Sequence, residues 1–185
     1  LGNMSIVELL LQGKTTTPAD LVKDLPGDNE AKAETIDNNL QHEIVKKMSS
    51  NPVYYGKLSE MLKKIIMQRK VAAMSYQEYL KQVVEMAEAI LHPEDNGDYP
   101  DEVKNSAARR ALFDYFEEDL ELTVDVDGAI RIAIRPAWKK NRQKQQKIRL
   151  AIYEKLLLHS YSKDKAEEET NQVFDIAQRQ EEYDA

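Results

Sequence analysis

The apolar side chains of this chain recur every three or four positions over most of its length. Between residues 30 and 50 they form one stripe, made up of Ile36, Leu40, Ile44 and Met48. Similar stripes follow in residues 52–70 and 76–91. This spacing gathers the apolar side chains on one face of an α-helix. The pattern therefore predicts three consecutive amphipathic helices.

Short polar motifs mark where two of these helices begin. Asn51 precedes Pro52, and proline is favoured at the first position of a helix because its missing N–H costs nothing there. Ser75 and Glu78 form a capping box, in which the serine oxygen accepts a hydrogen bond from the backbone amide of the glutamate. We therefore predict that helices start at residues 52 and 76.

Residues 120–135 fit two patterns at once. The alternation of a β-hairpin runs through Leu122, Val124 and Val126 and, after the turn-forming pair Asp127-Gly128, through Ile130, Ile132 and Ile134. A helical spacing runs through Leu122, Val126, Ala129, Ile130, Ala133 and Ile134. A lone hairpin would have no further strand to pair with and would be marginal. We predict a helix, in which Gly128 costs about 1 kcal/mol relative to alanine.

The remaining segments complete an all-α prediction. Residues 4–11 are typical of a short apolar helix, and residues 12–29, with their glycines and prolines, of a linker. Further helices are expected at 105–118 and 140–160, and the acidic end forms one more helix or a frayed tail. We expect an irregular bundle of six to eight helices. The expected division has three parts, residues 1–29, 30–160 and 161–185.

Composition narrows the chemistry of the chain. It has no cysteine, which excludes disulfides, thiolate nucleophiles and Cys-ligated zinc. No apolar run approaches the roughly 20 residues of a membrane-spanning helix, and the first residues lack the basic and apolar stretches of a signal peptide. We therefore expect a cytoplasmic location and no membrane partner. The first residue is Leu1 rather than Met, which favours a segment cut from a longer protein.

Positive charge is concentrated in one window of a chain whose net charge is −7. No acidic residue lies between Asp127 and Glu154, whereas eight lysines and arginines do. Together with the single tryptophan, these are the candidate contacts to a partner: Arg131, Arg135, Trp138, Lys139, Lys140, Arg142, Lys144, Lys147 and Arg149. Such a window is typical of a surface that meets phosphates or an acidic protein. The alternative is a solvated helix face, or one neutralised by the chain's own acidic tail.

No motif in the chain supports catalysis, a metal site or a bound cofactor. Gly13-Lys14-Thr15 resembles the end of a phosphate-binding loop, but Glu8 stands where that loop needs its first glycine. Residues 123–134 overlap a calcium loop, yet Ile134 occupies the position that needs a carboxylate. The three histidines, His42, His92 and His159, are far apart and lack the spacing of a zinc helix. We expect no enzyme activity in this chain.

Several segments carry a family resemblance. They are AETIDNNLQHEIVKKMSSNPVYYGKLSEMLKKIIMQRK (33–70), SYQEYLKQVVEMA (75–87), YPDEVKNSAARRALFDYF (99–116), the helix near 121–134 and WKKNRQKQQKIRLAI (138–152). Paired asparagines, Pro-x-Tyr-Tyr and Ser-Tyr-x-Glu-Tyr-Leu follow one another at the spacing found in the C-terminal helical region of the R subunit of type I restriction-modification enzymes. The chain resembles that region over about residues 30–155, in the same order.

This resemblance implies a part of a larger enzyme. In the family, a nuclease and two helicase-like motor lobes cleave DNA and translocate it with ATP and Mg²⁺, and none of their motifs occurs in this chain. The C-terminal helical region helps to dock the R subunit onto the methyltransferase core of M and S subunits. The first expectation is therefore a non-catalytic docking module, without a cofactor of its own, which contacts the M and S subunits and the motor lobes of its own R subunit.

Two alternatives stay open at this point. In one, the basic segment from Lys139 to Arg149 follows the phosphates of duplex DNA without reading the base sequence. In the other, the chain is an internal brace that packs on the motor lobes, and an extensive apolar surface would then be exposed in the isolated chain.

Overall fold

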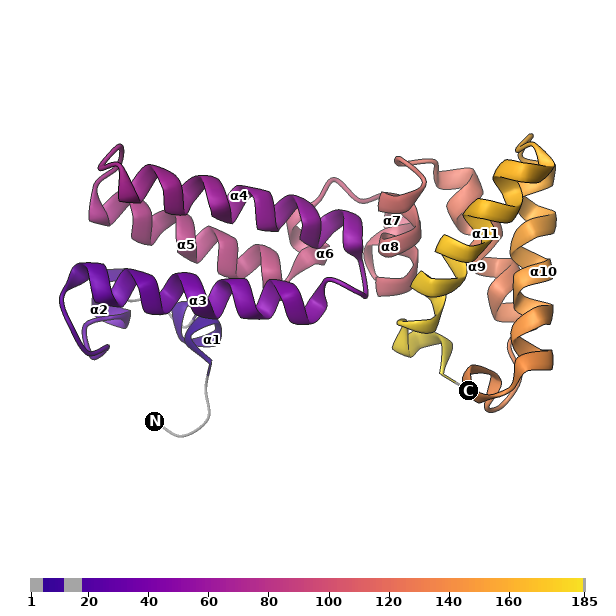
Figure 1. Ribbon diagram of the computed structural model, residues 1–185, viewed down its shortest axis with the longest axis horizontal. Helices are drawn as coiled ribbons and strands as arrows, with labels where there is room; N and C mark the ends of the chain where they lie inside the picture. Colours follow the sequence, from indigo (N-terminus) through magenta and orange to yellow (C-terminus); the bar gives the residue numbers. More distant parts are fainter. Residues whose placement is uncertain (1–4, 12–17, 185) are drawn as a thin grey trace. The chain divides into compact units, whose positions relative to one another are not determined.

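The computed structural model describes residues 5–11 and 18–184, and every regular element within these ranges is helical (Figure 1). They form eleven α-helices and two short 3₁₀-helices. Seven of the α-helices have nine or more residues, whereas α1, α2, α6 and α7 have six or fewer. The all-α prediction is confirmed, and the seven longer helices fall within the expected range of six to eight.

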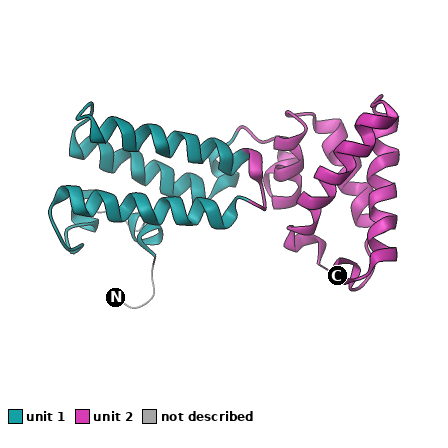
Figure 2. Cartoon of the chain, viewed as in Figure 1, with its two compact units in different colours: residues 1–48, 54–97 teal, residues 49–53, 98–185 magenta. Residues whose placement is uncertain are grey.

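The chain divides into two compact units (Figure 2). Unit 1 contains residues 1–48 and 54–97, and unit 2 contains residues 49–53 and 98–185. The expected boundary at residue 30 falls inside unit 1, because Val7, Leu10 and Val22 are buried in the same core as the long helices. The expected boundary at residue 161 falls inside unit 2 for the same reason. The Gly13-Lys14-Thr15 motif lies outside the described residues.

Unit 1 is built on three long helices. Its elements are α1 (Ile6–Leu11), α2 (Pro18–Leu21), α3 (Asn29–Lys47), α4 (Pro52–Lys70), α5 (Tyr76–Leu91) and α6 (Pro93–Asn96). Both predicted helix starts are confirmed, and Ser75 Oγ accepts from the amide of Glu78 at 3.1 Å. The predicted stripes form the core, with Ile36, Leu40 and Leu62 almost fully buried. Within residues 52–70, Met61 is an exception to this burial, since it is 52% exposed.

A buried carboxylate links the three long helices of unit 1. Asp37 on α3 accepts a hydrogen bond from Arg69 on α4 at 2.7 Å and one from the hydroxyl of Tyr79 on α5 at 2.8 Å. The Arg69 guanidinium also lies over the Tyr79 ring, 5.3 Å from its centroid. Both members of the ion pair are more than nine-tenths buried. A buried charge is tolerated only when it is paired and hydrogen-bonded, so this set fixes how the three helices pack.

Unit 2 places one long helix between two others. Its elements are α7 (Asp101–Lys104), α8 (Ala107–Tyr115), α9 (Leu120–Ala133), η1 (Trp138–Lys140), α10 (Arg142–Leu158), α11 (Lys163–Gln178) and η2 (Glu181–Tyr183). Helix α10 packs on both α9 and α11. Each of the four longer helices begins at a side chain that accepts from a backbone amide three residues on, namely Ser106, Asp119, Asn141 and Ser162. These caps satisfy amides that have no partner within the helix.

The ambiguous residues 120–135 form a helix, as predicted. Asp119 Oδ1 accepts from the amide of Leu122 at 2.9 Å and starts α9. Leu122, Val126 and Ile130 are buried in the core of unit 2, whereas Ile132 is 77% exposed. The alternating apolar pattern is therefore incidental here, and the three- and four-residue spacing decides the structure.

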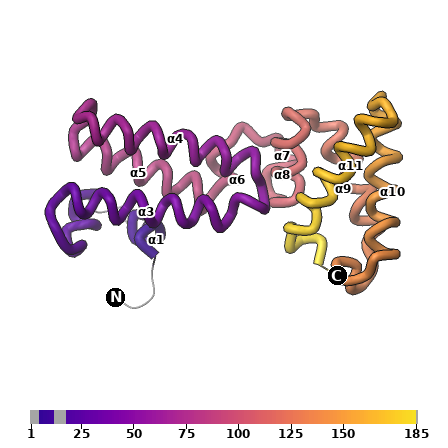
Figure 3. The backbone as a smooth tube through the Cα atoms, in the orientation of Figure 1, coloured from indigo at the N-terminus to yellow at the C-terminus, as the bar shows by residue number. Residues whose placement is uncertain are grey.

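The acidic C-terminal segment forms a helix and then folds back along unit 2 (Figure 3). Beyond α11, the short helix η2 buries Tyr183, which is 1% exposed. The Nε1 of Trp138 donates to the carbonyl of Tyr183 at 2.6 Å, and the side-chain amide of Gln180 donates to the carbonyl of Ser50 at 2.7 Å. Of the two forms expected for this segment, the structure contains the helix.

The carboxylate of Asp127 joins η2 to the rest of unit 2. It is fully buried on α9 and accepts hydrogen bonds from Arg109 Nε on α8 at 2.7 Å, from Arg131 Nε at 2.9 Å and from the Tyr183 hydroxyl at 2.7 Å. Burial by itself opposes ionisation, but these three donors outweigh it and hold the pKa of Asp127 below its ordinary value. Asp127 is therefore an ionised group on which three separate segments converge.

The substitution Asp127→Asn should lower the free energy of unfolding of unit 2 by about 3 kcal/mol, because it leaves two arginines without their buried partner. Chemical denaturation of the purified chain measures this loss. Asp125→Asn is the matched control, since its side chain is 43% exposed and pairs only with His159 and Lys155, and it should cost less than about 1 kcal/mol. Equal effects of the two substitutions would contradict the structural role of Asp127.

The ionisation of Asp127 also makes the stability of unit 2 depend on pH. The pKa of Asp127 is lower in the folded than in the unfolded state. Its contribution to the free energy of unfolding is therefore fully present above the unfolded pKa of about 3.9 and is lost as the pH falls through the folded pKa. In Asp127→Asn the loss of stability with falling pH should be smaller below about pH 4 than in the unmodified chain.

Candidate functional site

The nine candidate contacts lie on the last turns of α9, on the connection and η1, and on the first half of α10. The structure separates them into two groups. Some meet other parts of unit 2, and others face solvent around a cleft. The separation decides which of them can contact a partner.

Arg131 and Trp138 are held by contacts within unit 2. Arg131 donates to Asp127 and to Glu182, the latter at 2.9 Å, and its guanidinium lies 5.2 Å from the centroid of the Tyr183 ring. The ion pairs outweigh burial and raise the pKa of Arg131 above its ordinary value. Trp138 is 1% exposed and packs edge-to-face on Phe174. Arg131 therefore has two carboxylate partners of its own, although its side chain is 39% exposed. Trp138 is buried and cannot contact a partner, which corrects the expectation from sequence.

Arg135 and Lys144 hold the backbone between α9 and α10. Arg135 Nη1 donates to the carbonyls of Ile132 and Ile134, at 2.8 and 2.6 Å. Lys144 Nζ donates to the carbonyl of Pro136 at 2.6 Å. A cation at the C-terminal end of a helix stabilises its last carbonyl groups and the negative end of its dipole. Both residues therefore act locally, although each still contributes positive charge to this surface.

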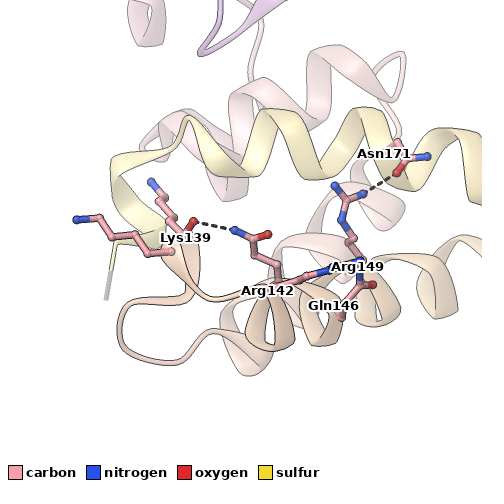
Figure 4. A pocket seen from close by; sticks show the side chains of 7 residues that line it. Lys139, Arg142, Gln146, Arg149 and Asn171 are labelled. Atoms are coloured by element: carbon pink, nitrogen blue, oxygen red, sulfur yellow. Dashed lines mark hydrogen bonds between the residues drawn. The ribbon is translucent and has the colours of Figure 1, made fainter.

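An open cleft of about 660 Å³ lies over η1, the start of α10 and the middle of α11 (Figure 4). The side chains that line it are Lys139, Lys140, Arg142, Gln145, Gln146, Arg149 and Asn171. Four of the seven are cations and the other three are amides, so no carboxylate is among them. The cleft therefore presents positive charge and amide donors to the solvent.

Arg149 is held in place within this cleft. Its Nη1 donates to Asn171 Oδ1 on α11 at 2.6 Å, as Figure 4 shows, and its guanidinium lies 3.9 Å from the centroid of the Phe174 ring. A guanidinium stacked on an aromatic face loses little further freedom when it binds an anion. Arg149 is therefore held by two contacts, both to residues of α11.

Three further cations point outward. Lys140, Arg142 and Lys147 are exposed and form no ion pair within residues 5–11 and 18–184. Arg142 is also the first residue of α10, where the positive end of a 17-residue helix adds to the field of the side chains. The arrangement suits an extended anion with several charges better than a single buried ligand, because the cations are spread over an open surface.

Some residues of the cleft could not be predicted from the positive charges of residues 131–149. Asn171 and the stacking ring of Phe174 come from α11, which the sequence assigned to an acidic extension. Gln145 and Gln146 carry no charge and were not among the predicted contacts, although Gln145 Nε2 donates to the carbonyl of Lys139 at 2.7 Å. The alternation of glutamine with lysine and arginine in residues 139–149 was the one available signal.

The histidines and carboxylates of the described residues do not form a metal site. Among the described residues, no group of three histidines, aspartates or glutamates is close enough to hold a metal ion. His159 Nε2 lies 2.9 Å from Asp125 and His92 Nδ1 lies 3.4 Å from Glu94, so each histidine pairs with one neighbouring carboxylate. None of the helices in the described part of the chain is both long and apolar enough to cross a bilayer.

Unit 1 carries a different kind of surface. A groove of about 460 Å³ runs between α4 and α5. Its lining includes the buried side chains of Leu58, Ile65 and Met86, and also Met61, which is 52% exposed. Lys64 and Glu85 are among the charged side chains that flank it. Methionine adapts its shape to different apolar partners, so this groove is suited to contact with protein.

Comparison of this chain with protein-family models, with curated proteins and with solved structures gives no match.

Cations that pair with carboxylates of unit 2 and cations that face solvent should differ in their effect on stability. Arg131→Gln should lower the free energy of unfolding by about 1.5–3 kcal/mol, because Asp127 and Glu182 each lose a charged donor. Arg142→Gln should change it by less than about 0.5 kcal/mol, since that side chain is exposed. Denaturant titrations of the two variants test this, and a large loss in Arg142→Gln would show that the outward group is also structural.

Proposed function

We propose that this chain is a non-catalytic helical interaction domain of a type I restriction R subunit, and that unit 2 contacts the phosphate backbone of duplex DNA through the cleft at η1 and α10. The observation that carries the DNA contact is the cleft itself, which four cations and three amides line without a carboxylate. The family part of the proposal rests on the sequence resemblance.

The chemistry of the cleft favours backbone contact over base recognition. Lysine and arginine neutralise phosphates whatever the base sequence, and such contacts position a protein on duplex without specifying a site. From Arg142 to Arg149 the helix rises about 10 Å, which spans roughly three steps along one DNA strand. Several successive phosphates therefore lie within reach of one face of α10.

Docking onto the methyltransferase core of M and S subunits is the second candidate function. The groove between α4 and α5 favours it, because Met61 leaves a large apolar side chain 52% exposed over a floor of buried residues. Grooves of this type accept an amphipathic helix of a partner protein. The two functions use different units and can coexist in one chain.

The proposal also gives the chain its place in the larger enzyme. By the logic of the family, DNA cleavage and translocation, with their ATP and Mg²⁺, belong to other parts of the R subunit, and sequence recognition belongs to another subunit. The chain would then act in the cytoplasm, in bacterial defence against foreign DNA, as a module that brings the motor to its partners.

The DNA contact predicts a defined salt dependence. Neutralising three cations that line the cleft together, as Lys140→Gln, Arg142→Gln and Arg149→Gln, should weaken binding to a duplex of arbitrary sequence. Each lost phosphate contact should reduce the slope of log affinity against log salt by about 0.9, so the triple variant should lose up to about 2.7. Fluorescence anisotropy with a labelled duplex over a range of salt concentrations measures the slope.

The matched control neutralises three exposed lysines of unit 1, as Lys57→Gln, Lys64→Gln and Lys81→Gln. It changes the net charge by the same amount but leaves the cleft intact. If both triple variants weaken DNA binding equally, the effect comes from the overall charge of the chain. That result would contradict a role of the cleft in binding DNA.

The docking function predicts that Met61→Asp abolishes binding to the methyltransferase core in the absence of DNA, since it places a charge over the apolar groove. Met67→Asp is the control, because Met67 lies on the same helix, is 63% exposed and does not line the groove. Sedimentation of the chain with the core reads out the complex. A chain that binds neither the core nor DNA would leave the internal brace as the remaining account.

A further inference from the structure

One cation of the cleft already holds an anion of its own chain. Lys139 lines the cleft, and its ammonium group pairs with the carboxylate of Asp184 and donates to the carbonyl of Gln180 at 3.0 Å. A carboxylate at this position presents the same charge and acceptor oxygens that a phosphate would present. The ion pair therefore marks a place where an anion is stable next to the cleft.

The two acidic residues on either side of Tyr183 are held very differently. Glu182 accepts from Ser106 Oγ at 2.7 Å, from the amide of Ala108 at 3.0 Å and from Arg131 at 2.9 Å, and together these donors outweigh burial and lower its pKa. Asp184 has the Lys139 ammonium as its side-chain partner within the described part of the chain, and its side chain is 60% exposed.

Tyr183 is the last strongly anchored residue of the segment. Its ring is buried, its hydroxyl donates to Asp127 and its carbonyl accepts from Trp138. Asp184 can therefore leave Lys139 by a rotation of its own side chain, without any movement of η2. The four-carbon stem of Lys139 is flexible, and the ammonium can reach an anion in the cleft once the carboxylate has left.

We propose that Asp184 is an internal competitor for a phosphate subsite at Lys139, and that a phosphate group of bound DNA displaces it. The inference rests on the proposed DNA contact of unit 2. It adds an autoinhibitory contact, in which the chain's own carboxylate lowers the affinity of the cleft for a polyanion. DNA binding is then an exchange of one anion for another at this lysine.

The test compares Asp184→Asn with Glu181→Gln in the whole chain. Both variants remove one negative charge from the same segment, but Glu181 is exposed and makes no ion pair among the described residues. At about 50 mM salt, Asp184→Asn should bind duplex DNA two- to fivefold more tightly than the Glu181→Gln variant, the range that an exposed ion pair contributes. The difference should shrink as salt screens the pair.

A double-mutant cycle isolates the contact. With Lys139→Gln in the background, Asp184→Asn should have no more effect than Glu181→Gln, since the shared partner is absent. Equal affinities of the two single variants, with salt-sensitive binding that depends on Lys140, Arg142 and Arg149, would overturn the competitor role and leave the proposed function standing. Absence of salt-sensitive DNA binding by the unmodified chain would overturn both.

Discussion

Each unit of this protein is organised around one buried aspartate that meets arginine and the hydroxyl of a tyrosine. In unit 1 the set is Asp37, Arg69 and Tyr79, and in unit 2 Asp127 meets Arg109, Arg131 and Tyr183. In both, an arginine also lies over the tyrosine ring. Apolar stripes alone would let helices slide or rotate against one another, whereas a buried charge is stable in one geometry only.

The set around Asp127 also holds the C-terminal segment of unit 2 next to the basic surface. Because Arg131 is committed to Asp127 and Glu182, and Trp138 to Tyr183, the C-terminal segment is fixed beside η1. Helix α11, which precedes this segment, packs on α10 and supplies the asparagine and the aromatic ring that hold Arg149. The cations with structural partners and the cations of the cleft therefore lie next to one another in the same unit.

The spacing of apolar residues was sufficient to predict the helices and most of the core, including α9, where the helical and hairpin patterns competed. It could not predict the buried aspartates. In the sequence Asp37 and Asp127 look like ordinary solvated residues, and their partners Arg69 and Tyr183 lie 32 and 56 positions away. The division into two units was missed for the same reason, since a polar interruption does not show whether the helices on either side share a core.

The candidate site was predicted in part. The cations of residues 131–149 were identified, but a linear window does not show which way each one points. Successive residues turn by about 100° around a helix, so Arg142 and Arg149 share one face of α10, while Lys144 and Lys147 lie on the opposite side. The sequence left open a helix face neutralised by the acidic tail, whereas among the described residues Glu182 and Asp184 pair with the cations Arg131 and Lys139.

The burial of the single tryptophan gives this chain an intrinsic optical probe. Trp138 is enclosed by Phe174, by the carbonyl of Tyr183 and by the core of unit 2, while unit 1 contains tyrosine and no tryptophan. Indole emission moves to longer wavelength when the ring becomes hydrated, so it reports on unit 2 alone. Circular dichroism follows the helices of both units, and the two signals together can resolve whether the units unfold in one step or separately.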